Sequence, residues 1–484
     1  MASSRVCCLP VVVILGSTGT GKSKLAIEIA RKLGGEIVSA DSMQVYKGLD
    51  IITNKVSPEE MALCPHHMLG FVPPLKEFSV VEYKNLALPL IYDIKKRGNI
   101  PIIVGGTNYY IESLLWDILI DQPENSHVID SASSSECEED SKVEKNFKKR
   151  KQIEGEGLQA LCDEKSAKTL MGSQSFQEGE NKNINSINEQ NTCSGVSEET
   201  SYCSTELYEK LKDIDPAMAD RVHPNDSRKI ARSLQVFQQT GVRHSELIAQ
   251  QQKQQGGNVL GGPLRFDVNC VFWLQCEREV LNERLDKRVD EMLQKGLLKE
   301  LLEFHVEYNQ TQSADYKKRY REGIFQSIGF KEFHPFLIQP NTSLHLGELS
   351  EGNKKLLDNC IDTMKNVTRR YAKKQITWVR NRFLGRPRES APDVYGLDTT
   401  DLGRWRENVF DKALIILTNI MEGHDSPIKP LPRISFNYNE RKLKYVCQQC
   451  DNRIIIGEEN WKRHQMSRSH KWHVKRNTRK SELY

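Results

Sequence analysis

The stretch that decides the fold is Gly16-Ser17-Thr18-Gly19-Thr20-Gly21-Lys22-Ser23. It follows an apolar, β-branched run at residues 10–15, which predicts a buried strand. It precedes residues 22–33, whose apolar positions recur at helical spacing and end at a Gly-Gly pair. A glycine-rich turn between a strand and a helix points backbone N–H groups at an anion, and the lysine adds a positive charge. The stretch therefore predicts a phosphate-binding loop, with the Ser23 hydroxyl available to Mg²⁺.

Further short apolar runs predict more strands of the same sheet. They occupy residues 36–40, 100–104 and 268–274, and helical patterns follow at 277–309 and 356–381. Strands that alternate with helices favour parallel pairing. We therefore expect an α/β fold in which a parallel sheet like that of the phosphate-loop NTPases forms the core.

The chain changes composition several times along its 484 residues, which predicts several units. Residues 124–204 are rich in Ser, Glu, Asn, Lys and Gln and poor in aromatics, so we expect a disordered insertion. The predicted units are a first core part (1–123), the insertion (124–204), a helical insert (205–262), a second core part with basic helices (263–385), a linker with one helical piece (386–440) and a basic tail (441–484).

Charge and cysteine content exclude some classes of protein. There are 69 basic and 65 acidic residues, giving a net charge of +4, which excludes a uniformly basic nucleic-acid wrapper. The apolar run near the start covers only residues 11–15, whereas a membrane helix needs about 20, so no membrane association is expected. Most of the 12 cysteines are scattered and no secretion signal is visible, which indicates a reduced protein inside the cell. The expected location is cytoplasmic, with mitochondrial and nuclear pools left open.

Asp41-Ser42-Met43-Gln44 follows the second predicted strand directly. Ligands of open α/β sheets bind beyond the carboxyl ends of the strands, so Asp41 is expected beside the phosphate loop. A carboxylate there can accept a proton or hold Mg²⁺. The alternative is a cap for the next helix.

Gly105-Gly106-Thr107 follows the third predicted strand, where many phosphate-loop NTPases carry an Asp that organises the metal. The lack of that Asp argues against nucleotide hydrolysis. Thr107 can donate a hydrogen bond to a substrate, and its alternative role is again a helix cap.

Arg228, Lys229 and Arg232 form a basic cluster in the predicted helical insert. Arg228 and Arg232 are four residues apart, so both lie on one helix face and suit a phosphate. A solvated charged face is the alternative.

The tail carries Cys447-x₂-Cys450-x₁₃-His464-x₅-His470. Two thiolates and two imidazoles at such spacing form the tetrahedral set that Zn²⁺ prefers. Residues 441–484 hold twelve Lys and Arg against four Asp and Glu, a net charge of +8. The tail therefore predicts a structural zinc finger that binds nucleic acid.

Six motifs in order give a resemblance to a family. They are the phosphate loop, Asp41–Tyr46, Gly105–Thr107, Pro224–Arg232, Gly323–Glu332 and Thr368–Trp378. Together they resemble the tRNA dimethylallyltransferases, also called tRNA isopentenyltransferases. The finger with its long His spacing resembles the eukaryotic members, and the resemblance leads us to expect a monomer.

The resemblance implies transfer of the dimethylallyl group from dimethylallyl diphosphate to N6 of the adenosine 3′ of a tRNA anticodon, position 37. Asp41 would remove a proton from the amine, with Thr107 as a hydrogen-bond partner. Mg²⁺ on Ser23 would assist the leaving diphosphate. The implied diphosphate ligands are Gly16, Ser17, Thr18, Gly19, Thr20, Gly21, Lys22, Ser23 and Arg232. The implied tRNA contacts are Asp41, Ser42, Met43, Gln44, Arg228, Lys229 and Arg232.

Three other functions share parts of this pattern. A small-molecule kinase would use the same loop and would place Asp41 on a hydroxyl. A non-catalytic role in RNA binding would account for the zinc finger, but it would not account for the phosphate loop. Prenyl transfer to free AMP is the third alternative, but a mononucleotide would not need the zinc finger and the long helical second half of the chain.

Overall fold

The computed structural model describes all residues except 1–8, 119–203, 309–319, 321–322, 340–349 and 482–484. A six-stranded parallel sheet forms the core, in the order β3-β2-β4-β1-β5-β6. The strands are β1 (Val11–Gly16), β2 (Gly35–Ser39), β3 (His66–His67), β4 (Ile100–Val104), β5 (Asn269–Gln275) and β6 (Val394–Asp398). The predicted α/β fold with a parallel sheet is confirmed.

Helices cover both faces of this sheet. Val12 and Ile14 face α1 (Lys22–Leu33) and α15 (Asp411–Glu422), whereas Val11 and Val13 face α3 (Val80–Lys96) and α4 (Asn108–Leu115). β1 is buried on both sides, which explains its unbroken apolar sequence. Ser79 and Glu82 cap the start of α3 reciprocally. The central strands thus lie between two layers of helices.

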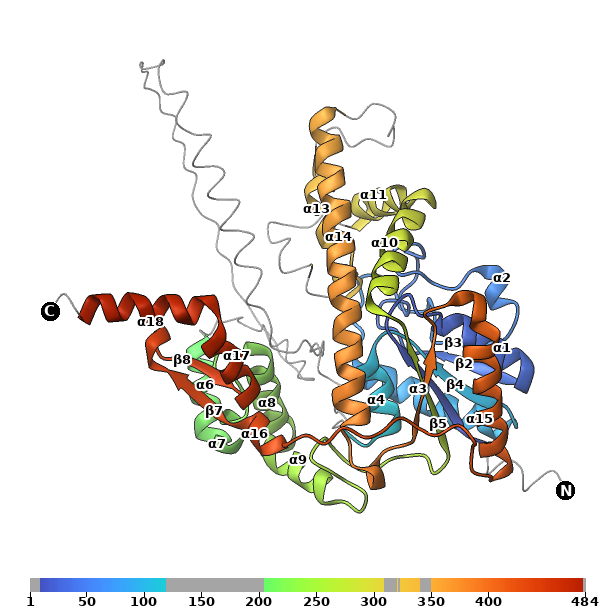
Figure 1. The fold of residues 1–484 in the computed structure, drawn as a ribbon, viewed down its shortest axis with the longest axis horizontal. Helices are drawn as coiled ribbons and strands as arrows, with labels where there is room; N and C mark the ends of the chain where they lie inside the picture. The colour runs from blue at the N-terminus through green and yellow to red at the C-terminus, as the bar shows by residue number, and fades with distance from the viewer. Residues whose placement is uncertain (1–8, 119–203, 309–319, 321–322, 340–349, 482–484) are drawn as a thin grey trace, which may run out of the picture.

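A second helical layer extends beyond the sheet, around the long helix α14 (Glu351–Trp378) (Figure 1). Its other members are α10 (Arg278–Gln294), α11 (Leu297–Tyr308) and α13 (Phe330–Leu337), and α2 (Pro58–Met61) is a short helix near the sheet. Its apolar cluster includes Phe330 and Phe333, and also Tyr46 from the loop after β2. This packing links the loop after β2 to the helical layer.

The helical insert and the tail lie on the other side of α14 from α1 (Figure 1). The insert comprises α6 (Ser204–Ile214), α7 (Pro216–Ala219), α8 (Ser227–Thr240) and α9 (His244–Lys253). The tail comprises α16 (Tyr438–Lys442), β7 (Lys444–Cys447), β8 (Arg453–Ile456), α17 (Glu458–Met466) and α18 (Arg468–Ser481). The insert has its own small apolar cluster around Leu211 and Ile230. Residues 204–253 thus form four helices that share a small apolar cluster.

The expectation of a linker at 386–440 is wrong for its central part. β6 forms the sixth strand of the sheet beside β5, and α15 buries Ile416 and Leu417 against the core. The helical piece expected there is present. The predicted insertion at 124–204 lies almost entirely outside the described residues.

Candidate active site

Three neighbouring strands bring the sequence motifs together at one edge of the sheet. β4 lies between β2 and β1, and all three are parallel. Their carboxyl ends therefore lead into Asp41, Gly105–Thr107 and the phosphate loop side by side. Topology alone places the predicted acid next to the predicted anion site.

The phosphate loop is closed by its own side chains. Lys22 Nζ donates to the Ser17 carbonyl at 2.9 Å, and Thr20 Oγ1 donates to the same oxygen at 2.8 Å. Gly19 and Gly21 have φ values of 85° and 84°, which a side chain would strain. The loop leads directly into α1, whose N-terminal end favours an anion.

Positive charge is gathered at this loop before any ligand arrives. Arg288 of α10 donates from Nη1 to Thr18 Oγ1 at 2.5 Å. Burial and the neighbouring Arg288 lower the pKa of Lys22 to about 8, although Asp41 opposes the shift. Two crowded cations favour an anion between them. Ser23, the predicted Mg²⁺ ligand, is exposed in the first turn of α1.

The two carboxylate oxygens of Asp41 have different surroundings. Oδ1 accepts a hydrogen bond from Met43 N at 3.0 Å within a turn at residues 42–45. The next helix, α2, begins only at Pro58, so the capping alternative for Asp41 is wrong. Oδ2 lies at Gly106, where an added Cβ would sit only 2.8 Å from it. Gly106 therefore leaves room for the carboxylate at the edge of the phosphate-loop site.

Thr107 fixes the turn that carries Asp41. Its hydroxyl accepts from Ser42 N at 2.9 Å and donates to Ser42 Oγ at 3.0 Å, and it makes no side-chain cap on α4. Thr107 is the N-cap residue of α4, so the capping alternative holds for its position, whereas its side chain does not cap the helix. Its observed contact is with the turn.

The half-buried Gln44 side chain makes its hydrogen bonds within the protein. Its Nε2 donates to the carbonyls of Thr53 and Asn54 at 3.1 and 3.0 Å, while Oε1 accepts from Ser39 Oγ at 3.4 Å. These contacts anchor the loop after β2. Met43 and Ser42 are half-buried in the same turn.

Gln375 of α14 bridges the phosphate loop and the turn after β4. Its Oε1 accepts from Thr18 N at 2.9 Å, and its Nε2 donates to the Gly106 carbonyl at 2.9 Å. Tyr371 OH donates to the same carbonyl at 3.1 Å. Burial and Asp41 raise the pKa of Tyr371, so its hydroxyl stays a donor. Helix α14 thus closes the site over the strand ends.

The structure does not bring Arg232 to the phosphate loop. Arg232 donates to Gln235 within α8, on the other side of α14 from α1 (Figure 1). Lys229 pairs with Asp226 at 2.8 Å, and Arg228 is exposed on the same helix. The apolar residues of α8 pack within the insert. The sequence pattern of α8 therefore does not indicate how far Arg232 lies from the phosphate loop. Among the described residues, Arg288 is an arginine that contacts the loop, through Thr18.

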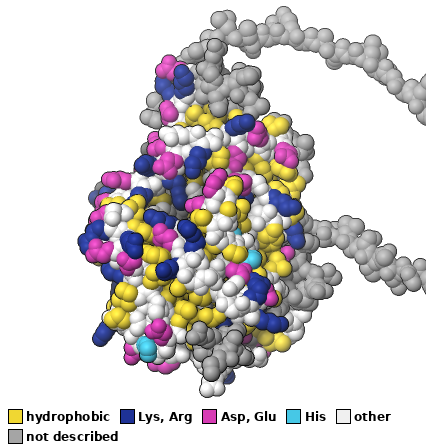
Figure 2. Space-filling view, turned by 90° about the vertical axis from the view of Figure 1, so that its right-hand side faces the viewer, with side chains coloured by type: hydrophobic (Ala, Val, Ile, Leu, Met, Phe, Trp, Pro, Cys, Tyr) yellow, Lys and Arg dark blue, Asp and Glu magenta, His cyan; other side chains and the backbone are white. Residues whose placement is uncertain are grey.

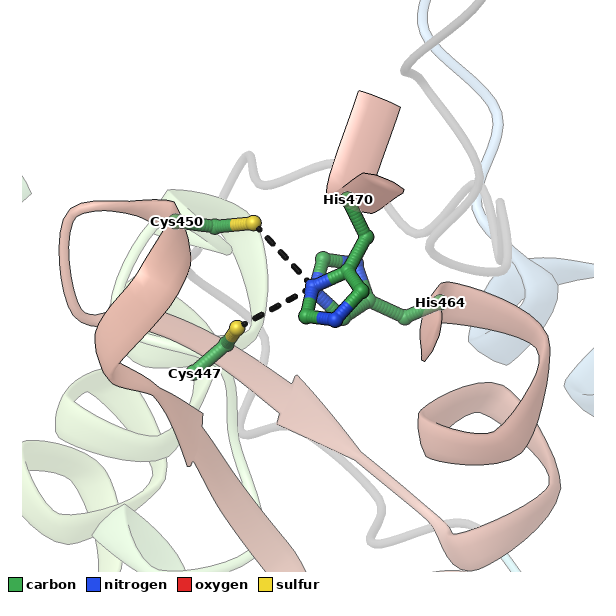
Figure 3. Close-up of side chains that lie close together, drawn as sticks. All are labelled: Cys447, Cys450, His464 and His470. Atoms are coloured by element: carbon green, nitrogen blue, oxygen red, sulfur yellow. Dashed lines mark hydrogen bonds between the residues drawn. The ribbon is translucent and has the colours of Figure 1, made fainter. Parts of the chain in front are cut away.

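The four predicted metal ligands converge in the tail. Cys447, Cys450, His464 and His470 offer ligand atoms that all lie within 4.8 Å of one another, and both thiols lie 3.4–3.5 Å from His470 Nδ1 (Figure 3). The buried Nε2 of His464 has no hydrogen-bond partner. Two sulfurs and two imidazole nitrogens at this separation fit a tetrahedral metal ion.

The tail docks on the insert. His223 Nε2 lies 3.2 Å from the Ile454 carbonyl of β8, and Lys444 Nζ donates to Tyr208 OH at 3.0 Å. The two segments are more than 200 residues apart and lie side by side in Figure 1. We call this pair, residues 204–253 and 438–481, the outer lobe.

The side of the molecule away from the outer lobe has mixed charge. Figure 2 views the side that carries α1 and α15, where basic and acidic side chains are interspersed. Such a surface has little general attraction for a polyanion. Within the described residues, no helix is both long and apolar enough to cross a membrane.

Comparison with known proteins identifies the family. The IPP transferase model matches residues 44–170 and 158–382, and the isopentenyl transferase model matches residues 9–64. The chain belongs to the IPP transferase family. The resemblance drawn from the sequence motifs is confirmed.

Named relatives span almost the whole chain. The tRNA dimethylallyltransferase of Mus musculus is 44% identical over 97% of this chain and 87% of its own length, and that of Homo sapiens is 43% identical with the same coverage. A solved structure of a eukaryotic dimethylallyltransferase acting on tRNA shares 29% identity and a TM-score of 0.70, over 98% of both chains.

Three residues of this IPP transferase site escaped prediction as phosphate-loop partners. Arg288 and Gln375 lie in the second core part with its predicted basic helices, and neither was assigned to the loop. Trp405 fell in the supposed linker, yet its ring would lie 2.8 Å from a Cβ on Gly21, and its Nε1 donates to Glu28 at 2.8 Å. The available signal for Gln375 was its place in the motif Thr368–Trp378, and that for Arg288 was its basic charge in a predicted helix. Trp405 had none.

Proposed function

We propose that this chain is a tRNA dimethylallyltransferase that transfers the dimethylallyl group from dimethylallyl diphosphate to N6 of the adenosine at tRNA position 37. The products are N6-isopentenyladenosine and diphosphate. Family membership and the named relatives support the reaction class. The site geometry supports the assignment of roles.

The leaving group is held at the phosphate loop. Cleavage of an allylic C–O bond builds negative charge on the diphosphate, and preorganised cations and N–H groups stabilise that charge. The backbone of Gly16–Ser23, Lys22 and Arg288 supply them here. Ser23 would hold Mg²⁺, which adds positive charge at the phosphates; its exposed hydroxyl beside Lys22 fits this role.

The acceptor amine is placed by Asp41. The Oδ2 oxygen that faces Gly106 accepts one N–H of the adenine amine and takes its proton as the C–N bond forms. Thr107 and Ser42 hold the turn in place. The adenosine has to leave its stack, which costs a few kcal/mol and is easiest in a loop of RNA.

The outer lobe holds the tRNA. Arg228 and Lys229 lie on exposed positions of α8, and the finger adds exposed Lys471 and Lys475 on α18. Zn²⁺ bound by Cys447, Cys450, His464 and His470 would fold the finger, because the buried His464 Nε2 lacks any other partner. A cytoplasmic location with mitochondrial and nuclear pools, and a monomeric state, stay predictions.

One observation carries this proposal: Gly106, which contacts Asp41, is joined through Gln375 to the phosphate-loop amide of Thr18. The donor's leaving group and the acceptor's base therefore lie within one side chain of each other. We expect labelled dimethylallyl diphosphate and unmodified tRNA to yield labelled N6-isopentenyladenosine on nucleoside analysis. Label transferred to AMP, or from γ-labelled ATP to a small molecule, in place of tRNA would overturn the assignment.

A further inference from the structure

Gln375 has a carboxamide whose two ends contact the two halves of the site. The residue is 4% exposed and belongs to α14, far from both partners in the sequence. Oε1 accepts from Thr18 N in the phosphate loop, and Nε2 donates to Gly106 O, the residue against which Asp41 Oδ2 lies.

Gln375 Oε1 occupies the place at which a phosphate oxygen would accept a hydrogen bond from the loop. In a phosphate loop, backbone N–H groups such as that of Thr18 are the donors to ligand oxygens. Without a ligand, the Gln375 oxygen satisfies this N–H. A diphosphate that uses the Thr18 N–H must displace the carboxamide oxygen.

The structure allows the side chain to leave without stranding its partners. The Gly106 carbonyl keeps a second donor, Tyr371 OH at 3.1 Å, and Thr18 N gains a phosphate oxygen. The backbone of Gln375 stays fixed because Asn108 Nδ2 donates to its carbonyl at 3.3 Å. An exchange of this kind requires movement of the carboxamide alone, and a buried oxygen left without a donor is costly.

The adenine amine can supply that donor. N6 carries two N–H groups, and Asp41 accepts one of them in the proposed function, on which this inference rests. We propose that Gln375 is a positioning residue that couples the two sites: diphosphate takes its place on Thr18 N, and the released oxygen accepts the second N–H of the acceptor amine. Coupling of this kind is reciprocal, so either ligand improves binding of the other.

The first test measures inorganic pyrophosphate binding by calorimetry in Gln375→Met, which keeps the side-chain length and lacks both polar ends. Removing the competing hydrogen bond should tighten pyrophosphate binding about 2–10-fold. Gln375→Glu, with a stronger acceptor at Thr18 N, should weaken it. Thr368→Val is the control, because Thr368 is buried in the same helix and bonds only within it, to Met364 O at 2.8 Å.

The second test measures binding of an anticodon stem-loop RNA with and without pyrophosphate. In the wild type and Thr368→Val, pyrophosphate should tighten RNA binding about 5-fold or more, and Gln375→Met should lose this effect. Weaker pyrophosphate binding in Gln375→Met, or coupling that persists in it, would overturn the proposal. Pyrophosphate binding does not require prenyl transfer, so it can be measured whether or not the wild type modifies tRNA. A wild type that transfers no prenyl group to tRNA would refute the proposed function and leave the binding test of Gln375 intact.

Discussion

The phosphate-loop site and the outer lobe both present cations to phosphate, in opposite environments. At the loop, Lys22 and Arg288 are partly buried and tied to Ser17 and Thr18. On α18, Lys471 and Lys475 are exposed. Charges in a desolvated site interact strongly and are little screened by salt, whereas exposed charges act weakly and depend on salt. This difference agrees with the proposed roles, chemistry at the loop and reversible RNA binding at the outer lobe.

The largest effect expected is at Asp41. Asp41→Asn keeps the size of the side chain and removes the base, so kcat should fall about 10²–10⁴-fold while pyrophosphate binding is retained. Single-turnover transfer with saturating tRNA measures this. Asp93→Asn, an exposed site at the far end of α3, is the matched control. Unchanged turnover in Asp41→Asn would remove the acid from the mechanism.

Loss of Lys22 comes next. Lys22→Met should reduce transfer about 10²–10³-fold or more, because one preorganised cation on the leaving group is gone. Lys32→Met, exposed at the end of the same helix, should have no effect.

The same residue gives a pH dependence. Burial lowers the pKa of Lys22 to about 8, so its charged form is lost as pH rises through 8 in the free protein. Pyrophosphate binding should therefore weaken above pH 8, and Lys22→Met should lack this component. A wild-type profile that coincides with that of Lys22→Met in calorimetry would contradict it.

Metal removal should affect the outer lobe and spare the core. Structural Zn²⁺ contributes on the order of 10–16 kcal/mol to folding small fingers. Cys447→Ser should unfold the finger, expose the insert face around His223 to hydrogen exchange and weaken tRNA binding, while pyrophosphate binding is unchanged. Cys64→Ser, outside the finger, is the control. Lost pyrophosphate binding in Cys447→Ser would show that the two regions are not independent.

The smallest effect concerns the exposed charges of α18. Lys471→Gln with Lys475→Gln should weaken tRNA binding modestly and reduce the slope of log K against log salt by about 1–2, as each lost phosphate contact contributes about 0.7–0.9. Lys32→Gln with Lys96→Gln, exposed on the core, should leave the slope unchanged.

The sequence predicted the features that depend on local pattern. The phosphate loop, the position of Asp41 after β2 and the finger spacing are short-range signals, and the sheet topology turned the first two into one site. β6 was missed because Val394–Asp398 contains a glycine and follows a proline, and its strand character comes from pairing with β5. Local propensity did not distinguish it from a loop.

The partners of the loop could not be predicted because they depend on packing across the fold. Arg288 and Arg232 both lie in helices that contain other basic residues. They differ in their contacts: Arg288 of α10 donates to Thr18, whereas Arg232 donates to Gln235 within α8. Gln375 is 357 residues from Thr18, and no local pattern in the sequence connects the two.

The most direct test of the account is a crystal structure with tRNA and an unreactive thiolodiphosphate analogue of the donor. We expect the diphosphate on the amides of Gly16–Ser23 with Lys22 and Arg288, and the N6 amine of the flipped adenosine within hydrogen-bond distance of Asp41 Oδ2. A diphosphate bound anywhere else, or an adenosine that stays stacked in the RNA away from Asp41, would contradict the account.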